Sequence, residues 1–184
     1  MRDSTGAIRI QPTKTERREH SGPIFLTSSF QYSSAEEAEA YFAGELEGDI
    51  YSRFSNPNTT ELIEKMCFLE RVKAGVATAS GMAAIFATVA SHLKSGDLIV
   101  ASNSLFGNSL AILQKILPSW GIETVLVDIN IKKQWEKALM KKPKLVLIET
   151  PSNPGLDVID LEWLGGLCRK NGAIFAVDNC FATP

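Results

Sequence analysis

Four short polar segments of this chain carry side chains that could bind a ligand, and each follows an apolar run. They are Ser80-Gly81-Met82, the segments around Phe106 and Asn153, and Asp178-Asn179. The first stands at the expected start of a helix, where free backbone N–H groups and the helix dipole favour an anion. Gly81 permits close approach and the Ser80 hydroxyl adds a donor. Ser80 could equally be only the N-cap of an ordinary strand-to-helix turn.

The second and third segments offer an aromatic ring and an amide. Phe106 precedes Gly107 and could stack on a flat ligand, although single aromatic side chains more often fill a core. Asn153 stands between Pro151 and Pro154, which restrain its backbone while the amide both donates and accepts. Because Asn-Pro is also typical of ordinary turns, both interpretations stay open for each residue.

Asp178 ends an apolar run, and a carboxylate there is costly to bury unless it meets a cation or strong donors. It could pair with a protonated ring nitrogen, bind a metal, or cap the segment that follows. Taken together, the anion cradle, aromatic face, rigid amide and carboxylate suit a flat, phosphorylated, cationic heterocycle. Pyridoxal phosphate has that chemistry.

The composition argues against several other classes of protein. With 21 acidic and 19 basic residues the formal charge is −2, so no strong field favours nucleic acid or an anionic membrane. The chain is 45% hydrophobic, which is enough for a buried core. No apolar run is long enough to span a bilayer and the N-terminus lacks a secretory signal core, so we expect a cytoplasmic protein.

Neither metal binding nor a disulfide framework is indicated. His20 and His92 are the only histidines, and they form no metal-binding motif. Three widely spaced cysteines, Cys67, Cys168 and Cys180, are too few for a disulfide scaffold. No metal ligand is therefore predicted.

A regular series of elements from Gly75 onward must position the four polar segments. β-Rich apolar runs predict five strands at residues 75–79, 97–101, 123–127, 145–149 and 174–178. Helices are predicted between them at residues 81–93, 106–117, 132–140 and 161–171. Continuous apolar strands that alternate with helices indicate a three-layer α/β/α domain with a mostly parallel sheet. Ligands bind beyond the carboxyl ends of such strands, where all four segments lie.

The part of the chain before this series has a different character. Residues 1–33 lack periodicity and predict an extended arm that docks on another surface. Ser34 and Glu37 form a capping box, which predicts a helix to about Glu47. Asn58 is predicted to cap a second helix. We therefore divide the chain into an N-terminal arm and helix, 1–48, and a larger domain, 49–184.

Five blocks, in order, resemble the Cys/Met-metabolism pyridoxal-phosphate enzymes, the cystathionine γ-synthase family. They are residues 23–30, Tyr51-Ser52-Arg53 with Asn56-Pro57, Ser80-Gly81-Met82-Ala83-Ala84, residues 149–154, and Val177-Asp178-Asn179 with residues 181–184. Each block alone is weak, but five in the family order are specific. The resemblance implies the large domain of a fold-type-I pyridoxal-phosphate transferase, incomplete here, preceded by an N-terminal arm.

The resemblance also implies a role for each matching residue in binding pyridoxal 5'-phosphate. Gly81 and Met82 would donate backbone N–H groups to its phosphate, with Ser80 beside them. Asp178 would pair with the pyridinium nitrogen. Asn153 would contact the cofactor's phenolic oxygen or the carboxylate of an amino-acid substrate, and Phe106 would stack on the ring.

Tyr51 and Arg53 would act on a neighbouring subunit. In the family they reach the phosphate of that subunit's cofactor, and Tyr51 also lies near the substrate. This role implies a homo-oligomer, with a dimer of dimers expected. The residues alone indicate only a loop with a guanidinium that suits phosphate.

Phe106 marks one departure from the family pattern. Many members carry tyrosine at this position, and phenylalanine has no hydroxyl for proton transfer to a leaving group. Leu105-Phe106-Gly107, with Glu19-His20 ahead of the residue 23–30 block, looks most like the O-succinylhomoserine sulfhydrylase branch. That branch makes homocysteine from sulfide and O-succinylhomoserine by γ-replacement, and O-acetylhomoserine is an alternative substrate. Cystathionine γ-synthase or γ-lyase activity is an alternative within the family.

The second departure is an absent lysine. The family's Schiff-base lysine lies downstream in a Ser-x-Thr-Lys context, which does not occur up to Pro184. We therefore assign no catalytic residue within the chain and expect these 184 residues alone to be inactive. A fragment of an active enzyme is the favoured interpretation. A catalytically dead partner of full-length chains is a second, and an unrelated α/β sugar-phosphate binder is a third.

Overall fold

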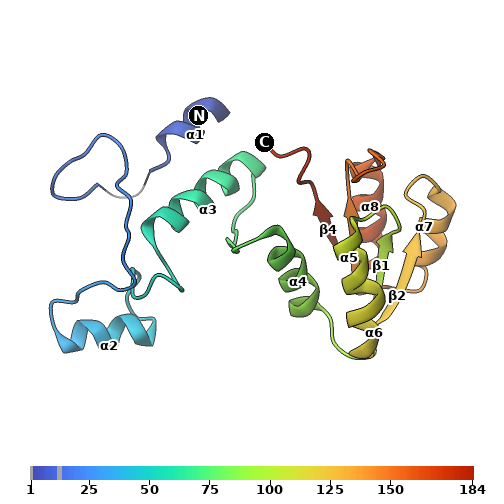
Figure 1. The fold of residues 1–184 in the computed structure, drawn as a ribbon, viewed down its shortest axis with the longest axis horizontal. Coiled ribbons are helices and arrows are strands. Elements are labelled where there is room, and N and C mark those ends of the chain that lie inside the picture. Colours follow the sequence, from blue (N-terminus) through green and yellow to red (C-terminus); the bar gives the residue numbers. More distant parts are fainter. Residues whose placement is uncertain (1, 12–13) are drawn as a thin grey trace. The chain divides into compact units, whose positions relative to one another are not determined.

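The computed structural model describes residues 2–11 and 14–184 (Figure 1). It comprises two compact units, Met1–Ala77 with Pro184, and Thr78–Thr183. The division predicted between residues 48 and 49 falls inside the first unit and stays a prediction. Among the described residues, no helix is both long and apolar enough to cross a membrane.

The first unit contains α1 (Asp3–Arg9), α2 (Ala35–Ala43) and α3 (Pro57–Glu70). Helix α1 was not predicted, because a single seven-residue helix shows no sustained periodicity. Its contact with α3 depends on Gly6, where an added Cβ would lie 2.0 Å from Cε1 of Phe68. The prediction of a wholly extended arm is therefore wrong at residues 3–9.

Pro23 and Phe25 of the arm bind to the start of α3. Asn56, not Asn58, is the N-cap of α3, because its Oδ1 accepts a hydrogen bond from the Asn58 N–H at 2.9 Å. The Asn58 side chain instead binds the arm. It accepts from the Phe25 N–H at 2.8 Å and donates to the Pro23 carbonyl at 2.8 Å.

Helix α2 begins where the capping box predicts. Ser34 Oγ accepts from the Glu37 N–H at 3.1 Å, and the Glu37 carboxylate accepts from the Ser33 N–H. The helix ends at Ala43, earlier than the predicted Glu47. Gly44 stops it by adopting the left-handed conformation, with φ of 74°.

The second unit is built on a four-stranded parallel sheet. Its strands are β1 (Leu98–Ser102), β2 (Glu123–Val127), β3 (Leu145–Glu149) and β4 (Ile174–Asp178), in the order β2-β1-β3-β4. The helices α4 (Gly81–His92), α7 (Lys132–Leu139) and α8 (Leu161–Asn171) agree with the predicted bounds to within one residue. The α/β fold class with a parallel sheet is confirmed.

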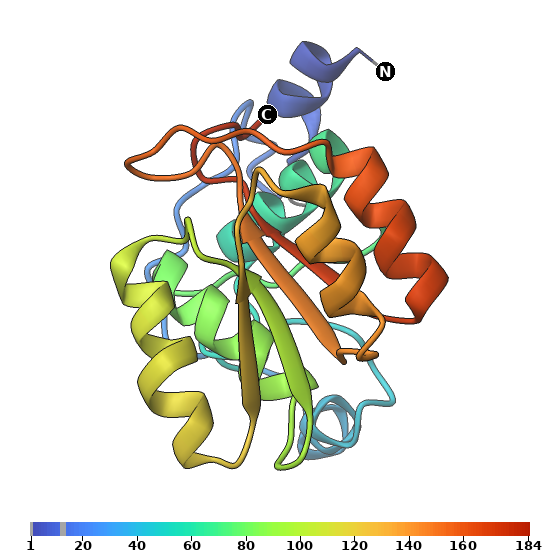
Figure 2. The same ribbon diagram turned by 90° about the vertical axis from the view of Figure 1, so that its right-hand side faces the viewer.

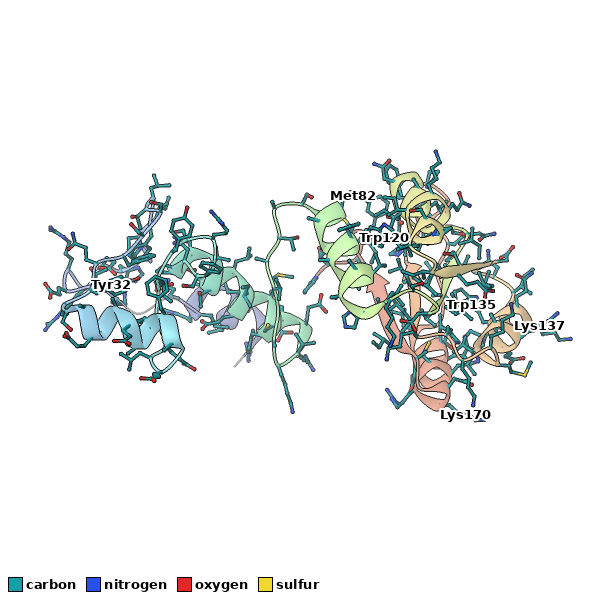
Figure 3. All side chains as sticks on the ribbon, turned by 90° about the horizontal axis from the view of Figure 1, so that it is seen from below. Tyr32, Met82, Trp120, Trp135, Lys137 and Lys170 are labelled. Carbon is teal, nitrogen blue, oxygen red and sulfur yellow. The ribbon has the colours of Figure 1, made fainter. Side chains whose placement is uncertain are left out.

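Helices cover both faces of this sheet, as Figure 2 shows. On one face, Val89 of α4 and Leu113 pack with Leu145 and Leu147 of β3. On the other, Trp135 of α7 and Leu164 of α8 pack with Val146 and Ile148. Trp135 is enclosed in this layer, whereas the labelled Lys137 and Lys170 point outward (Figure 3). Alternate residues of β3 thus serve opposite faces.

Two elements predicted from Gly75 onward differ from the structure. Residues 75–79 form no strand, because they make no ladder with any described strand, and Val76 is 88% exposed. The predicted helix 106–117 is divided into α5 (Gly107–Ala111), a π-helical turn (Ile112–Ile116) and α6 (Leu117–Ser119). Pro118 explains this division, since it lacks an N–H and crowds the carbonyl one turn earlier.

Candidate functional site

A cavity of about 180 Å³ lies at the carboxyl edge of the sheet in the second unit. Five residues that the sequence predicted for the site line it: Gly81, Met82, Phe106, Asn153 and Asp178. They come from the start of α4 and from the ends of β1, β3 and β4 or the loops that follow them. The topology therefore brings together residues up to 97 positions apart (Gly81 to Asp178).

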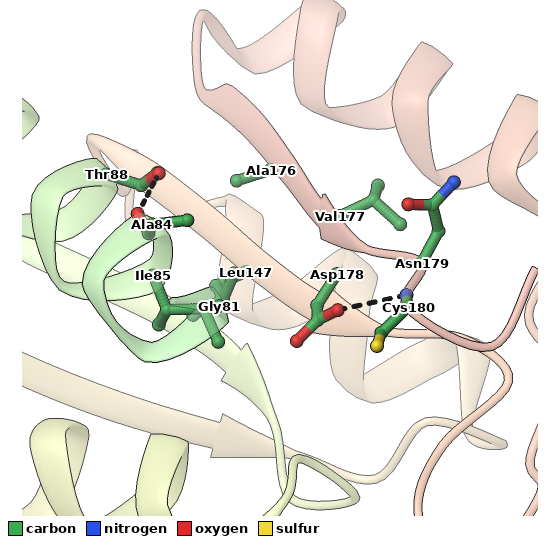
Figure 4. A pocket seen from close by; sticks show the side chains of 10 residues that line it. All are labelled: Gly81, Ala84, Ile85, Thr88, Leu147, Ala176, Val177, Asp178, Asn179 and Cys180. Atoms are coloured by element: carbon green, nitrogen blue, oxygen red, sulfur yellow. Dashed lines mark hydrogen bonds between the residues drawn. The ribbon is translucent and has the colours of Figure 1, made fainter. Parts of the chain in front are cut away.

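A second hollow of about 260 Å³ adjoins the first and is shown in Figure 4. The two share Gly81, Ile85, Asp178 and Cys180. Gly81 of α4 and the carboxylate of Asp178 both border this hollow (Figure 4). Asp178 therefore lines both hollows.

The N-terminus of α4 offers backbone donors to the cavity. Ser80 is the N-cap, and its Oγ accepts from the Ala83 N–H at 3.2 Å. Its hydroxyl proton is still able to donate. Gly81 and Met82 are the first two helical residues, so no carbonyl one turn earlier in the helix accepts from their N–H groups. Both interpretations of Ser80, as N-cap and as extra donor, are compatible with this geometry.

Gly81 is not required by the packing around it. A Cβ added there would meet no atom within 4 Å, and its φ is not in the left-handed range. Glycine at a helix position normally costs stability relative to alanine. The space in front of Gly81 therefore suits close approach by a bound group.

Asp178 uses one carboxylate oxygen to cap the segment after β4. Its Oδ1 accepts from the Cys180 N–H at 3.1 Å, drawn in Figure 4. No hydrogen bond to its Oδ2 is made by the described residues. That oxygen can accept from a protonated nitrogen of a ligand in the cavity.

Glu149 is an acidic residue of the cavity lining for which the sequence predicted no role. It is 5% exposed, and its carboxylate accepts two backbone hydrogen bonds. Phe106 N–H donates to Oε2 at 2.7 Å and Asn153 N–H donates to Oε1 at 2.9 Å. A signal was present, because β3 and β4 both end an apolar run on an acidic residue.

Loop residues 150–157 after β3 are held by a local network. The Asp157 carboxylate accepts from Asn130 Nδ2 at 3.0 Å and from Ser152 Oγ at 3.2 Å. The bond from Asn130 contributes most to keeping the pKa of Asp157 below its ordinary value, and burial opposes this effect. Asn153 is thus restrained by its own bond to Glu149 at the start of the loop and by the bond from its neighbour Ser152 to Asp157 at the end.

Tyr51 and Arg53 belong to the first unit. Tyr51 pairs with Ser29 in an isolated antiparallel bridge, and the Arg53 guanidinium lies 5.2 Å from the Tyr51 ring centroid. Both side chains are exposed. They lie next to each other, as the sequence indicates, and their action on a cofactor stays a prediction.

The cavity matches the parts of pyridoxal phosphate by donor type. The two N–H groups of α4 suit the phosphate, Asp178 Oδ2 suits a protonated ring nitrogen, and Phe106 offers an aromatic face. Among the described residues, no group of three or more His, Cys, Asp or Glu could hold a metal ion. This fold and this set of donors are compatible with the class of proteins that use pyridoxal phosphate.

Comparison with known proteins identifies the family within that class. Residues 4–184 match the family described as Cys/Met metabolism PLP-dependent enzyme, and the chain belongs to that family. Its cofactor is pyridoxal 5'-phosphate. The resemblance stated from the five sequence blocks is confirmed.

Similar curated proteins have more than one activity. The chain is 39% identical over 180 residues to O-succinylhomoserine sulfhydrylase of Pseudomonas aeruginosa, covering 98% of this chain and 45% of that protein. It is 44% identical over 161 residues to the Mycobacterium tuberculosis enzyme of the same name (88% and 40%). L-methionine gamma-lyase of Fusobacterium nucleatum is 40% identical over 163 residues (88% and 41%). The chain thus spans less than half the length of these relatives.

Solved structures confirm the fold. Cystathionine gamma synthase from Xanthomonas oryzae, in complex with aminoacrylate and cysteine, superposes with a TM-score of 0.90 at 30% identity, covering 100% of this chain and 46% of that one. A Campylobacter jejuni structure assigned to O-acetylhomoserine (thiol)-lyase gives 0.89 at 28% identity, with 97% and 44% covered. That structure contains N'-pyridoxyl-lysine-5'-monophosphate.

Proposed function

We propose that this chain forms the cofactor-binding half of an O-succinylhomoserine sulfhydrylase. The reaction would replace the succinyl group of O-succinylhomoserine with sulfide, giving homocysteine and succinate. The main support is that one cavity is lined by Gly81, Met82, Phe106, Asn153 and Asp178. The sulfhydrylase relatives, at 39% and 44% identity, support the choice of reaction.

The chain's own residues would bind and orient the cofactor. The N–H groups of Gly81 and Met82, the Ser80 hydroxyl and the dipole of the 12-residue helix α4 bind the phosphate. The Phe106 ring packs on one face of the pyridine. The Asn153 amide contacts the phenolic oxygen or the substrate carboxylate.

Asp178 would hold a proton on the ring nitrogen. Its Oδ2 accepts from that N–H, while Oδ1 is fixed by the Cys180 N–H at 3.1 Å. A carboxylate in contact with the ring nitrogen would favour the protonated ring. When bound, pyridoxal phosphate supplies an electron sink for negative charge that develops on the amino-acid substrate.

Tyr51 and Arg53 would serve a cofactor held by another copy of the chain. Both are exposed, and the stacked guanidinium and phenol offer a planar cation and a hydroxyl side by side. Such a pair suits a phosphate group. The active form would then be a homo-oligomer, with a dimer of dimers expected, acting on amino-acid substrates and sulfide.

We further propose that the 184 residues alone do not turn over substrate. They contain no lysine in a Ser-x-Thr-Lys context, which the family resemblance requires for covalent attachment of the cofactor. Steady homocysteine formation by the purified 184-residue chain would contradict this expectation.

The reaction is tested on the polypeptide that the complete reading frame encodes, purified and supplied with pyridoxal phosphate. The proposal expects homocysteine and succinate from O-succinylhomoserine, in a 1:1 ratio and only when sulfide is present. O-acetylhomoserine is assayed in parallel to decide the leaving group. Asp178→Asn is the control variant, which should lose the activity while the protein stays folded.

γ-Elimination is the second candidate, because the chain is 40% identical to an L-methionine gamma-lyase. In that case methionine and water would yield methanethiol, ammonia and 2-oxobutanoate without added sulfide. Formation of these products, together with no sulfide-dependent homocysteine, would favour the lyase. Formation of neither set of products would favour a partner subunit without catalysis of its own.

A further inference from the structure

Glu149 is a buried carboxylate that the proposed chemistry does not use. It is the last residue of β3 and is paired in register with Asp178, the last residue of β4. Side chains of register partners in parallel strands point to the same face of the sheet. The two carboxylates therefore border the same cavity.

The two acids have different partners. Asp178 Oδ2 is open to the cavity, whereas each oxygen of Glu149 accepts one backbone hydrogen bond. The donors are Phe106, which follows β1, and Asn153, which follows β3. No ion pair of Glu149 occurs among the described residues. Its charge is therefore stabilised mainly by these two N–H groups, which makes the bonds strong.

Phe106 and Asn153 lie on segments 43 and 4 residues away from Glu149 along the chain. Phe106 is 46% exposed, so side-chain packing fixes it only in part. The bond from its N–H to Glu149 therefore adds a restraint on the start of its helix, α5, beside the burial of Leu105 in the core. A shift of Glu149 would move the aromatic ring and the amide together.

We propose that Glu149 is the positioning residue of the cofactor site. Its carboxylate sets the spacing between the Phe106 ring and the Asn153 amide, and so decides whether a pyridine ring fits between them and Asp178. This inference rests on the proposed cofactor site and adds a residue to it. Among the described residues the Glu149 carboxylate makes its hydrogen bonds to Phe106 and Asn153 and none to the phosphate cradle at Ser80-Gly81-Met82, so it should affect ring binding and not phosphate binding.

The experiment compares Glu149→Gln with Ile148→Val in the whole chain. Glutamine keeps the length but has one acceptor oxygen, and its NH₂ group faces an N–H donor. Ile148, the preceding residue of β3, packs in the layer on the opposite face, so its variant tests destabilisation without a change in the cavity. The probes are pyridoxamine 5'-phosphate, which has no aldehyde to react with lysines, and inorganic phosphate.

Amide hydrogen exchange tests, without any ligand, whether Glu149 holds the Phe106 and Asn153 N–H groups. In Glu149→Gln, the N–H groups of Phe106 and Asn153 should exchange at least about tenfold faster, since a net hydrogen bond is lost at each. In Ile148→Val, any increase should be spread over the sheet. Unchanged exchange at both residues in Glu149→Gln would show that Glu149 does not hold the two loops, whatever the binding measurements give.

Calorimetry then tests the effect on binding. Glu149→Gln should weaken pyridoxamine phosphate about tenfold or more and leave inorganic phosphate within about twofold. Equal weakening of both probes, or of neither, would overturn the positioning role. If the wild-type chain binds neither probe, the proposed cofactor site fails, and the exchange measurement still decides whether Glu149 holds the two loops.

Discussion

Glu149 and Asp178 end neighbouring parallel strands as register partners, and both border the cavity at the carboxyl edge of the sheet. Both carboxylate oxygens of Glu149 accept hydrogen bonds from loop N–H groups, whereas only Oδ1 of Asp178 accepts one from the described residues. Glu149 can therefore hold the loops that line the cavity, while Asp178 can contact a ligand in it.

Replacement of Asp178 by asparagine should weaken the ring contact. A hydrogen bond to a charged group contributes about 1.5–3 kcal/mol, so pyridoxamine phosphate should bind about 10–100-fold more weakly at neutral pH. Inorganic phosphate should bind unchanged, because α4 holds it. Calorimetry with both probes checks this. Equal affinity of wild type and variant for pyridoxamine phosphate would exclude Asp178 as the ring partner.

Replacement of Gly81 by alanine should separate stability from binding. A Cβ there meets no protein atom within 4 Å, so the melting temperature should stay equal or rise. Both phosphate probes should bind more weakly, because the methyl group occupies the space in front of the helix N-terminus. Gly166→Ala in α8, also free of neighbours, is the matched control and should change neither affinity. Unchanged phosphate affinity in Gly81→Ala would contradict phosphate binding at the N-terminus of α4.

Phe106 should contribute through its ring alone. Phe106→Leu should weaken pyridoxamine phosphate about threefold to tenfold, since aromatic stacking contributes roughly 0.5–1.5 kcal/mol. Phe106→Tyr should keep the affinity within about twofold. The side chain is 46% exposed, so neither variant should unfold the protein. Equal binding by all three proteins in calorimetry would show that the ring does not stack on the ligand.

The cysteines should react with thiol reagents in a fixed order. Cys180 is exposed, whereas burial raises the pKa of Cys168 from 9.0 to about 11. At pH 8, a maleimide should modify Cys180 in the folded protein and Cys168 only after unfolding. Peptide mass mapping before and after denaturation checks the order. Modification of Cys168 first would contradict its burial.

The same pKa shift has a consequence for stability. Because the folded-state pKa of Cys168 is higher than the unfolded value, its stabilising contribution is complete below about pH 9. It is lost as the pH rises from 9 toward 11, where the unfolded thiol ionises and the folded one does not. Cys168→Ala should show a shallower loss of unfolding free energy over this range in urea titrations.

Periodicity predicted most of the second unit because its strands are continuously apolar. Strands β2, β3 and β4 begin and end at the predicted residues, and β1 is displaced by one. The strand at 75–79 failed for a different reason. Its apolar composition is suitable, but a strand also needs a partner, and pairing is not encoded locally.

Cap positions and the role of Glu149 depended on tertiary contacts. Asn56 and Asn58 are both residue types that favour the N-cap position. Asn56 is the N-cap, because the Asn58 side chain is already hydrogen-bonded to the arm. Similarly, Asp178 and Glu149 look alike in sequence. The loop N–H groups of Phe106 and Asn153 distinguish them, and one of those lies 43 residues away.

Pyridoxal phosphate is proposed to bind in the cavity between α4 and the ends of β3 and β4. A titration of the ¹⁵N-labelled chain with pyridoxamine 5'-phosphate, followed by two-dimensional NMR, tests it most directly. We expect the largest amide shifts at Gly81 and Met82, with further shifts at Phe106, Asn153 and Asp178. Saturable shifts confined to the opposite edge of the sheet, around Asp97 and Lys144, or no shifts at millimolar probe, would contradict it.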